Sequence, residues 1–461
     1  MVEKQTAQAV LDMALTTGGD FSELFMEDTE SNNISMNDGS VETATYSRIK
    51  GAGIRVLKGT KCAYAYTSDT REEALMETAR AAAAAIDGLK EGETREFSVR
   101  DYKKIPELPF SSIDNKTRVE LLKKGTAAAR AYSDEVSCVT ARYLDVDQRI
   151  MVCNSLGVWA EDRRPRTRIF VQAIASKDGE AQTGYESPGL GMGFKAYEII
   201  DAEKVGERAA KTAVTMLHAP QCPAGEFPVT IDGGFGGVIL HEACVHSLES
   251  TSVSRGNSEF CSKLGQKVAS DIVTAIDDGT MPGEWGSINV DDEGTPSQRN
   301  VLIENGILKS YLFDLLGARR MEHPLTGSSR RQSYAFAPTS RMTNTFFAPG
   351  NDDEDEMIST MGDGLFAAQM GGGSVNPLTG EFNFAVLEGY WVKGGKIYCP
   401  VRGATLIGRG ADVLMKIDRI GKRMWMGQGM CGSYSGSIPT NVGQPRIRVS
   451  SIVVGGKGGA L

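Results

Sequence analysis

Residues 233–250, GGFGGVILHEACVHSLES, predict the one helix expected in the first part of a β-rich C-terminal half. The stretch holds two of the four histidines of the chain, His241 and His246, and Glu242 follows the first. Zinc hydrolases often carry H-E-x-x-H, in which the histidines lie four residues apart on one helix face. Here the spacing is five residues, so an undistorted α-helix would turn the two imidazoles about 140° apart.

Three interpretations of this spacing are open. The helix can contain a π-bulge, which brings residues i and i+5 together and favours functional sites. It can begin or end inside the motif, or the histidines can be ordinary packed side chains without a metal. A catalytic zinc needs three protein ligands and one open position. The candidates for the third ligand are Cys244, Glu249, Asp291, Asp292 and Cys431.

The sequence around the motif predicts mainly antiparallel β structure. Residues 221–461 hold 37 of the 53 glycines, and short β-like runs such as 301–314 and 396–408 replace long helices. Glycine-rich turns between short apolar runs are typical of all-β domains. We therefore expect a β-rich, barrel-like domain over 225–461 that carries the motif helix.

The N-terminal half predicts two blocks, 1–90 and 113–218, each built of helices and antiparallel strands. The charged, proline-bearing residues 88–112 predict a linker between them. The expected fold class is therefore α+β, with an N-terminal α/β region of two helix-plus-strand blocks. The expected helices are 6–16, 71–87, 116–133 (capped by Ser112 or Asp114) and 201–216; the expected strands are 21–28, 31–36, 41–47, 51–57, 62–68, 137–144, 149–154 and 166–175, with a hairpin turn at Asn37-Asp38-Gly39.

Composition excludes several classes of protein. The net charge of −9 and the pI of about 5.3 argue against non-specific nucleic-acid binding. No run of about 18 apolar residues exists, so no membrane span is expected. The N-terminus MVEKQTAQAVLDMAL carries acids and no long apolar region, so we expect no signal peptide and a cytoplasmic location. The eight cysteines form no C-x-x-C pair and predict reduced thiols.

Several long motifs, in order along almost the whole chain, resemble the TldD/PmbA family, and its TldD branch in particular. They are GAGIRVL (51–57), GGFGGVILHEACVH (233–246), VDDEGTPSQRNVLIENGILKSYLFD (290–314), SRMTNTFFAPG (340–350), GGSVNPLTGEFNFAVLEGYWVKGGKI (372–397) and GMCGSYSGSIPTNVGQP (429–445). Each motif alone is weak, but their order makes the resemblance specific.

The resemblance implies a zinc-dependent metalloprotease that hydrolyses peptide bonds in unfolded proteins or peptides. It implies His241, His246 and Cys431 as zinc ligands and Glu242 as the general base, with the five-residue spacing as the family's own. It also implies a homodimer or a heterodimer with a PmbA/TldE-like paralogue. The alternative is a catalytically silent PmbA-like partner or peptide-binding subunit, which the retained motif argues against. A role in DNA topology, a label attached to parts of the family, has no support in the acidic charge.

Departures from the family pattern lie beside the second histidine. Val245 stands where the family usually has glycine and Thr251 where it has aspartate, whereas Glu249 is kept. These changes concern local packing and substrate approach. Farther along the chain, Arg341 and Asn344 are predicted to bind substrate carbonyls or a carboxylate, the alternative for Arg341 being a structural ion pair. The run 291–293 is predicted to form a turn.

Overall fold

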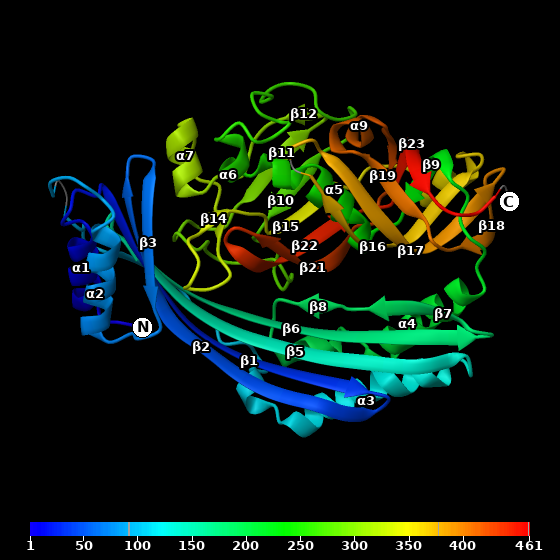
Figure 1. Ribbon diagram of the computed structural model, residues 1–461, viewed down its shortest axis with the longest axis horizontal. Coiled ribbons are helices and arrows are strands. Elements are labelled where there is room, and N and C mark those ends of the chain that lie inside the picture. The colour runs from blue at the N-terminus through cyan, green and yellow to red at the C-terminus, as the bar shows by residue number, and fades with distance from the viewer. Residues whose placement is uncertain (91–92, 377, 460) are drawn as a thin grey trace.

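A long curved sheet and a β-rich body lie face to face in a computed structural model of the chain (Figure 1). The structure describes residues 1–90, 93–376, 378–459 and 461. The expected α+β fold class is confirmed. Among the described residues, no helix is long and apolar enough to span a membrane.

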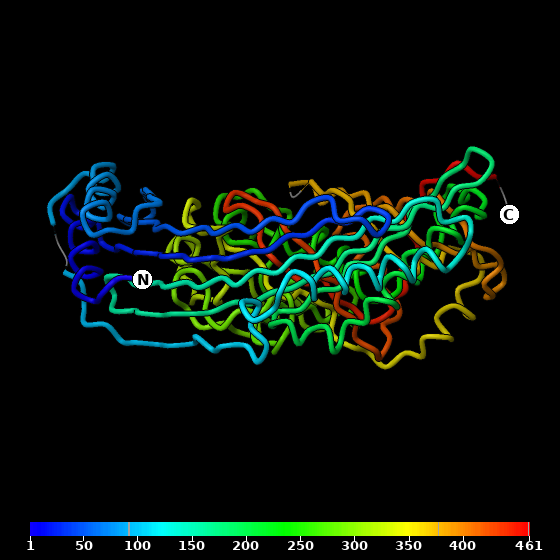
Figure 2. Tube along the Cα trace, turned by 90° about the horizontal axis from the view of Figure 1, so that it is seen from below, coloured from blue at the N-terminus to red at the C-terminus, as the bar shows by residue number. Residues whose placement is uncertain are grey.

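Strands from both expected N-terminal blocks join in one eight-stranded sheet. The order is β3-β2-β1-β5-β6-β4, and β7 and β8 pair with β6. The long strands run side by side along the molecule when it is seen from below (Figure 2). The bounds are β1 Phe21–Asn37, β2 Ser40–Lys58, β3 Lys61–Thr67, β4 Ser98–Tyr102, β5 Val136–Asn154, β6 Val158–Lys177, β7 Glu180–Glu186 and β8 Gly189–Leu190.

The linker prediction for 88–112 is wrong at β4. Residues 98–102 pair in parallel with β6, from Ser98 opposite Val158 to Tyr102 opposite Asp162. The edge of β6 offers unpaired backbone groups, and an extended segment satisfies them. Proline and charge in the surrounding residues concealed this short strand.

Several strands are longer than the sequence predicts. The expected strands 21–28 and 31–36 are one strand, β1, because β2 and β5 pair with it along almost its whole length. The predicted hairpin turn is confirmed: Asp38 and Gly39 have φ of 46° and 81°, as the tight turn between β1 and β2 requires.

The four expected N-terminal helices are present. They are α1 Lys4–Ala14, α2 Glu72–Ala83, α3 Asn115–Ala131 and α4 Ala202–Leu217. The backbone N–H of Thr117 donates to the side chain of Asp114 at 2.8 Å, which caps α3 as predicted. α1 and α2 lie together at one end of the long sheet, and α3 covers the face turned away from the β-rich body (Figure 1).

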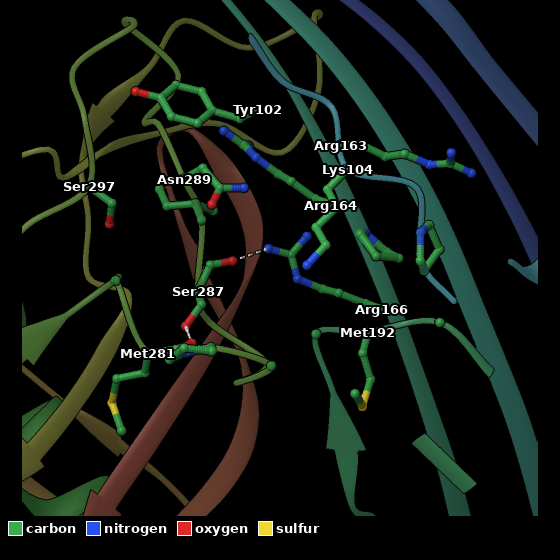
Figure 3. A pocket seen from close by; sticks show the side chains of 18 of the residues that line it. Tyr102, Lys104, Arg163, Arg164, Arg166, Met192, Met281, Ser287, Asn289 and Ser297 are labelled. Atoms are coloured by element: carbon green, nitrogen blue, oxygen red, sulfur yellow. Dashed lines mark hydrogen bonds between the residues drawn. The ribbon is translucent and has the colours of Figure 1, made fainter. Parts of the chain in front are cut away.

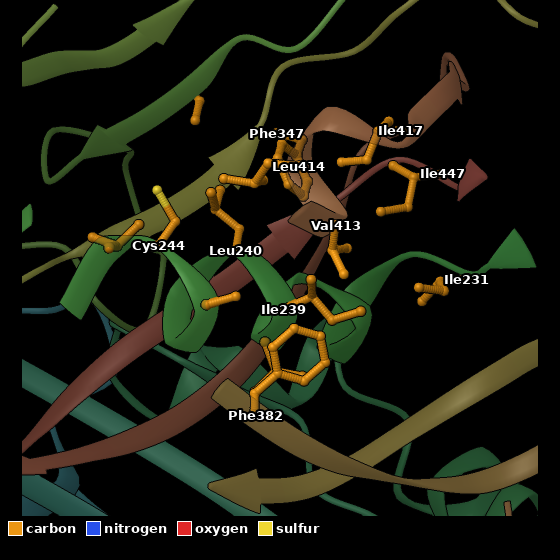
Figure 4. Packing of buried hydrophobic residues seen from close by; sticks show 14 of the residues in the cluster. Ile231, Ile239, Leu240, Cys244, Phe347, Phe382, Val413, Leu414, Ile417 and Ile447 are labelled. Atoms are coloured by element: carbon orange, nitrogen blue, oxygen red, sulfur yellow. The ribbon is translucent and has the colours of Figure 1, made fainter. Parts of the chain in front are cut away.

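The predicted barrel-like domain is confirmed by a closed ring of five strands. The ring runs β16-β9-β23-β19-β17 and closes because β16 also pairs with β17. The motif helix α5 packs against it: Figure 4 shows Ile239 and Leu240 among side chains that include Phe382 and Leu414. The strands are β9 Gly225–Ile231, β16 Gly364–Val375, β17 Glu381–Lys393, β18 Lys396–Val401, β19 Thr405–Arg409, β20 Ile417–Ile420 and β23 Ile447–Gly455.

A second sheet carries the other wall of the site. Its order is β12-β11-β10-β15-β22-β21, and β15 runs parallel to β22. Its strands are β10 Ala275–Asp278, β11 Arg299–Glu304, β12 Ile307–Leu308, β15 Asn344–Phe347, β21 Trp425–Ser433 and β22 Gly436–Gln444. The remaining elements are η1 Phe110–Ser112, η2 Phe194–Glu198, η3 Gly234–Gly237, α5 Val238–Ala243, η4 Val245–Leu248, α6 Ser250–Val253, α7 Leu315–Met321, β13 Ser329–Arg330, β14 Thr339–Ser340, α8 Glu354–Ser359 and α9 Gly410–Met415.

Buried ion pairs join the long sheet to the β-rich body. Arg55 Nη2 lies 2.6 Å from Glu293 Oε1, and Arg164 Nη1 lies 2.7 Å from Asp292 Oδ1. Residues 292 and 293 are in a turn, as predicted, and this turn presents its carboxylates to arginines of the other half.

Candidate metal centre

The motif helix ends inside the motif. α5 stops at Ala243, and Cys244 leaves the helical region with φ −135° and ψ −59°. A 3-10 turn, η4, then carries His246. The rings of His241 and His246 therefore lie close together, edge to face, with centroids 4.9 Å apart and an interplanar angle of 83°. Of the three interpretations of the spacing, the interrupted helix is the one the geometry supports.

Glycines fix where the motif helix begins. A Cβ at Gly237 would lie 2.5 Å from the backbone nitrogen of Gly443, so only glycine lets the chain start α5 directly against β22. β21 is the next strand of the sheet, and Cys431 on it pairs with Ile438 of β22. The packing of α5 against β22 therefore brings the thiol of Cys431, 190 residues farther along the chain, close to His241.

Three potential ligand atoms converge between α5, η4 and β21. Cys431 Sγ lies 3.3 Å from His241 Nε2 and 3.2 Å from His246 Nε2. One ligand atom from each of the three residues lies within 4.8 Å of the others. His241 and Cys431 are 3% and 5% exposed, so the donor set is shielded from bulk water.

The donor set fits a zinc ion. Zinc binds imidazole nitrogen and thiolate sulfur at about 2.0–2.3 Å, which places tetrahedral ligands about 3.5 Å apart. The two nitrogen–sulfur separations, 3.3 and 3.2 Å, are close to that value. Mixed nitrogen and sulfur donors also favour zinc over hard cations such as magnesium or calcium.

The electrostatics of the cluster favour a thiolate. Burial alone would raise the pKa of Cys431, but the adjacent His241 and His246 lower it to about 4. Burial likewise opposes the charged form of His246, but Glu249 and Cys431 raise the pKa of this histidine well above its usual value. The thiolate is the form in which cysteine binds metals.

Polar groups behind the donors hold the two rings in place. His246 Nδ1 lies 3.2 Å from Glu249 Oε1, and His241 Nδ1 lies 3.5 Å from Thr345 Oγ1. Metal-binding histidines usually give their second ring nitrogen to such a partner. The sequence offered Glu249 as a ligand rather than as this partner, although its position three residues after His246 could have suggested the contact. No pattern in the sequence pointed to Thr345.

Glu242 lies beside the donor atoms. Its Oε2 is 3.8 Å from His246 Nε2, and its side chain is 24% exposed, compared with 13% for His246. A carboxylate in this position can reach both the cluster and a molecule that enters from solvent.

Arg341 and Asn344 lie in the wall of the site. Arg341 Nη2 donates to the carbonyl of Cys431 at 2.7 Å, and its Nε lies 3.5 Å from Glu249 Oε1. Asn344 Nδ2 donates to the carbonyl of Asp278 at 2.6 Å. Both side chains are 0% exposed. That Arg341 and Asn344 bind substrate stays a prediction. The contacts that the structure shows for them are with other residues of the wall.

The other third-ligand candidates lie elsewhere. Cys244 is fully buried in the hydrophobic core at the end of α5. Asp291 accepts backbone N–H groups of its own turn, and Asp292 pairs with Arg164.

Comparisons with known proteins agree along the chain. Family models of the PmbA/TldA metallopeptidase match residues 22–86 as domain 1, 108–217 as the central domain and 224–456 as the C-terminal domain. A "Metalloprotease TldD homolog" of Haemophilus influenzae is 33% identical over 466 residues, which cover 98% of this chain and 96% of the relative. The chain belongs to the TldD/PmbA family.

Two further proteins extend the comparison. A "Zinc metalloprotease TldD homolog" of Saccharolobus solfataricus is 29% identical over 266 residues, 58% of this chain and 59% of the relative. The crystal structure of TldE from Thermococcus kodakarensis superposes with a TM-score of 0.77 at 17% identity, covering 97% of this chain and 99% of that one. At that identity the likeness concerns the fold alone.

Proposed function

We propose that the protein is a zinc-dependent metallopeptidase of the TldD type that cleaves unfolded proteins or peptides. The observation that carries the proposal is the convergence of His241, His246 and Cys431 at the interruption of α5. The donor set suits zinc, and Glu242 stands beside it as the general base requires. Family membership supports the same activity.

The proposed reaction is hydrolysis with Glu242 as the proton carrier. Zinc, when bound, supplies the Lewis acidity that polarises a peptide carbonyl and lowers the pKa of a water molecule. The Glu242 carboxylate accepts a proton of the attacking water while the water oxygen bonds to the carbonyl carbon. Glu242 then gives this proton to the amine nitrogen as the carbon–nitrogen bond breaks. Glu249 and Thr345 keep the imidazoles oriented throughout.

The substrate is proposed to lie extended beside β21. A cavity of about 580 Å³ follows this strand and is lined by residues 425–430 and by Gly233, Gly234 and Phe235, which lead into α5. β21 is an edge strand of its sheet, and Cys431 follows residues 425–430 on the same strand. An extended peptide recognised through its backbone at a sheet edge needs no particular side chains, which suits unfolded substrates.

A partner subunit is proposed to cover part of β2. β3 pairs only with residues 52–58 of this strand, and residues 40–50 are exposed. Val41, Tyr46 and Ile49 are 44%, 60% and 45% exposed. A long open strand edge with apolar side chains favours association with another chain. We propose a second copy or a TldE-like paralogue as the partner.

A digest with and without metal tests the proposed activity. Purified protein should cleave reduced, unfolded casein, read by mass spectrometry, lose this activity in a zinc chelator and regain it when zinc is added. His241→Ala should retain far less zinc than the parent, and Lys309→Ala, on the surface, should retain the same amount. A protein that neither binds zinc nor cleaves casein would support the silent-subunit alternative, and cleavage that persists in chelator would reject the zinc dependence.

A further inference from the structure

A second cavity lies at the junction of the two halves, away from the metal cluster. It has a volume of about 460 Å³. Its walls are residues 163–166 of β6, residues 102–107 after β4, and the segment 279–289 that follows β10. Figure 3 shows side chains of these segments around the cavity, with Arg166 extending toward Ser287 and Arg163 pointing away from the cavity. This volume is in the range of pockets that bind small molecules.

Five cationic side chains line this junction cavity, and three of them are neutralised. Arg163 Nη2 lies 2.6 Å from Asp147 Oδ2, and Arg164 pairs with Asp162 and Asp292. Lys195 pairs with Glu107. The remaining two, Lys104 and Arg166, form no ion pair among residues 1–90, 93–376, 378–459 and 461, although Glu107 lies near Lys104 and Asp162 and Asp292 lie near Arg166.

Arg166 is the buried member of this unpaired set, at 3% exposure. Its Nε donates to the carbonyl of Trp285 at 2.8 Å and its Nη2 to the carbonyl of Ser287 at 3.1 Å. Both acceptors are neutral, and within the described chain Nη1 has no acceptor. Burial and the nearby Arg330 and Arg164 lower its pKa to about 9, which leaves it charged at neutral pH.

Apolar side chains favour a ligand with an apolar body beside its anionic head. Met192, Met281 and Pro282 line another part of the wall. A buried cation without a directly paired carboxylate is costly, and an anion bound beside it reduces that cost.

We propose that the junction cavity binds a small organic anion, whose carboxylate or phosphate head contacts Arg166 and Lys104 and whose apolar part contacts Met192 and Met281. Arg166 supplies Nη1 as a charge-assisted donor inside the cavity, and Lys104 supplies charge at its rim. None of the candidate zinc ligands lines this cavity, so the failure of the peptidase proposal would not affect the proposed anion site, and the reverse also holds.

Calorimetric titration at constant ionic strength tests the site. The probes are phenyl phosphate, phenylacetate and, as the neutral analogue, benzyl alcohol. At least one anion should bind saturably, and the tighter of the two identifies the preferred head group. Benzyl alcohol should bind at least ten-fold more weakly, because it cannot form the charge-assisted contact. Absence of saturable anion binding, or equal binding of benzyl alcohol, would overturn the proposal.

Variants assign the site to this cavity. Arg166→Met should weaken anion binding at least ten-fold, with circular dichroism as the check on folding. Lys104→Met, at an exposed position, should weaken it several-fold without any effect on the fold. Lys195→Met is the matched control, since this lysine lines the same cavity but is already paired with Glu107. Equal effects of the two lysine changes, or unchanged binding in Lys104→Met, would refute the site.

Discussion

Two buried clusters of ionisable side chains differ in how their charges are balanced. At the junction of the halves, arginine meets carboxylate: Arg331 Nη2 lies 2.6 Å from Glu23 Oε1, and Arg55 lies between Glu23 and Glu293. Around Cys431, two imidazole nitrogens and a sulfur converge on one another, and the carboxylate of Glu249 lies behind one ring, at His246 Nδ1. A cluster that is neutral in itself holds the fold together, whereas converging lone pairs call for a cation.

We expect the largest effect from Glu242→Gln, which should lower activity at the metal centre and leave the junction cluster unaffected. Without a carboxylate to accept the proton of water, the rate of peptide hydrolysis should fall about 10²- to 10⁴-fold. Zinc content, measured by elemental analysis, should stay as in the parent, because Glu242 is not one of the three converging donors. Glu304→Gln, at an exposed position, is the control. Undiminished hydrolysis in Glu242→Gln would remove this residue from the mechanism.

Arg331→Met is expected to act on stability instead. The change leaves Glu23 buried with one arginine partner fewer, and breaking such a pair costs about 3–5 kcal/mol of the free energy of unfolding. Urea denaturation followed by circular dichroism measures this loss. Lys309→Met, which removes one half of an exposed pair with Glu304, should leave the unfolding midpoint almost unchanged. A similar midpoint for both variants would contradict the structural role of the junction cluster.

Glu249→Gln should weaken the metal centre without removing a ligand. Loss of the carboxylate behind His246 Nδ1 should lower zinc affinity about 10- to 100-fold, as measured by competition with a fluorescent zinc indicator. Glu259→Gln is a matched control, because this buried glutamate also has an arginine partner, Arg409, but lies outside the cluster. An unchanged zinc affinity in Glu249→Gln would show that Glu249 does not support the ring.

Asp277 should give an effect of another kind, a change in how stability depends on pH. Burial raises the pKa of Asp277 to about 7, against hydrogen bonds from Thr343 that lower it. Between pH 4 and 7 the folded protein holds a proton that the unfolded chain has released, so stability should fall as pH rises. The contribution is at most about 1.4 kcal/mol per pH unit. Urea titrations at several pH values should show a shallower fall in Asp277→Asn; an identical slope would contradict the assignment.

Local patterns predicted the elements that depend on local chemistry. The cap of α3 at Asp114 and the turn at Asp38-Gly39 follow from side-chain and backbone preferences of a few residues. The length of β1 and the existence of β4 depend instead on partner strands far along the chain, which no local pattern reveals. The division at 1–90, 113–218 and 225–461 stays a prediction, and the first two of these segments share one sheet.

The candidate site was predictable only in part for a similar reason. The sequence showed His241, Glu242 and His246 together, but the spacing left their geometry open. Cys431 was one of five candidates for the third ligand, and the family resemblance singled it out, because its approach depends on the packing of α5 against β22 and the pairing of β22 with β21. The unpaired Arg166 could not be recognised at all, since only the folded chain shows which arginines form no ion pair.

The backbone of Cys244 has a consequence for relatives of this protein. In an uninterrupted helix, residue 246 would stand about 140° around the axis from residue 241, so the torsion angles of this single residue decide whether the two rings meet. A substitution nearby that restored helical torsions would separate them while every candidate ligand remained in place. A family member could thus keep His241, His246 and Cys431 and still lack the convergent cluster, and an inspection of its sequence for those residues would not detect the loss.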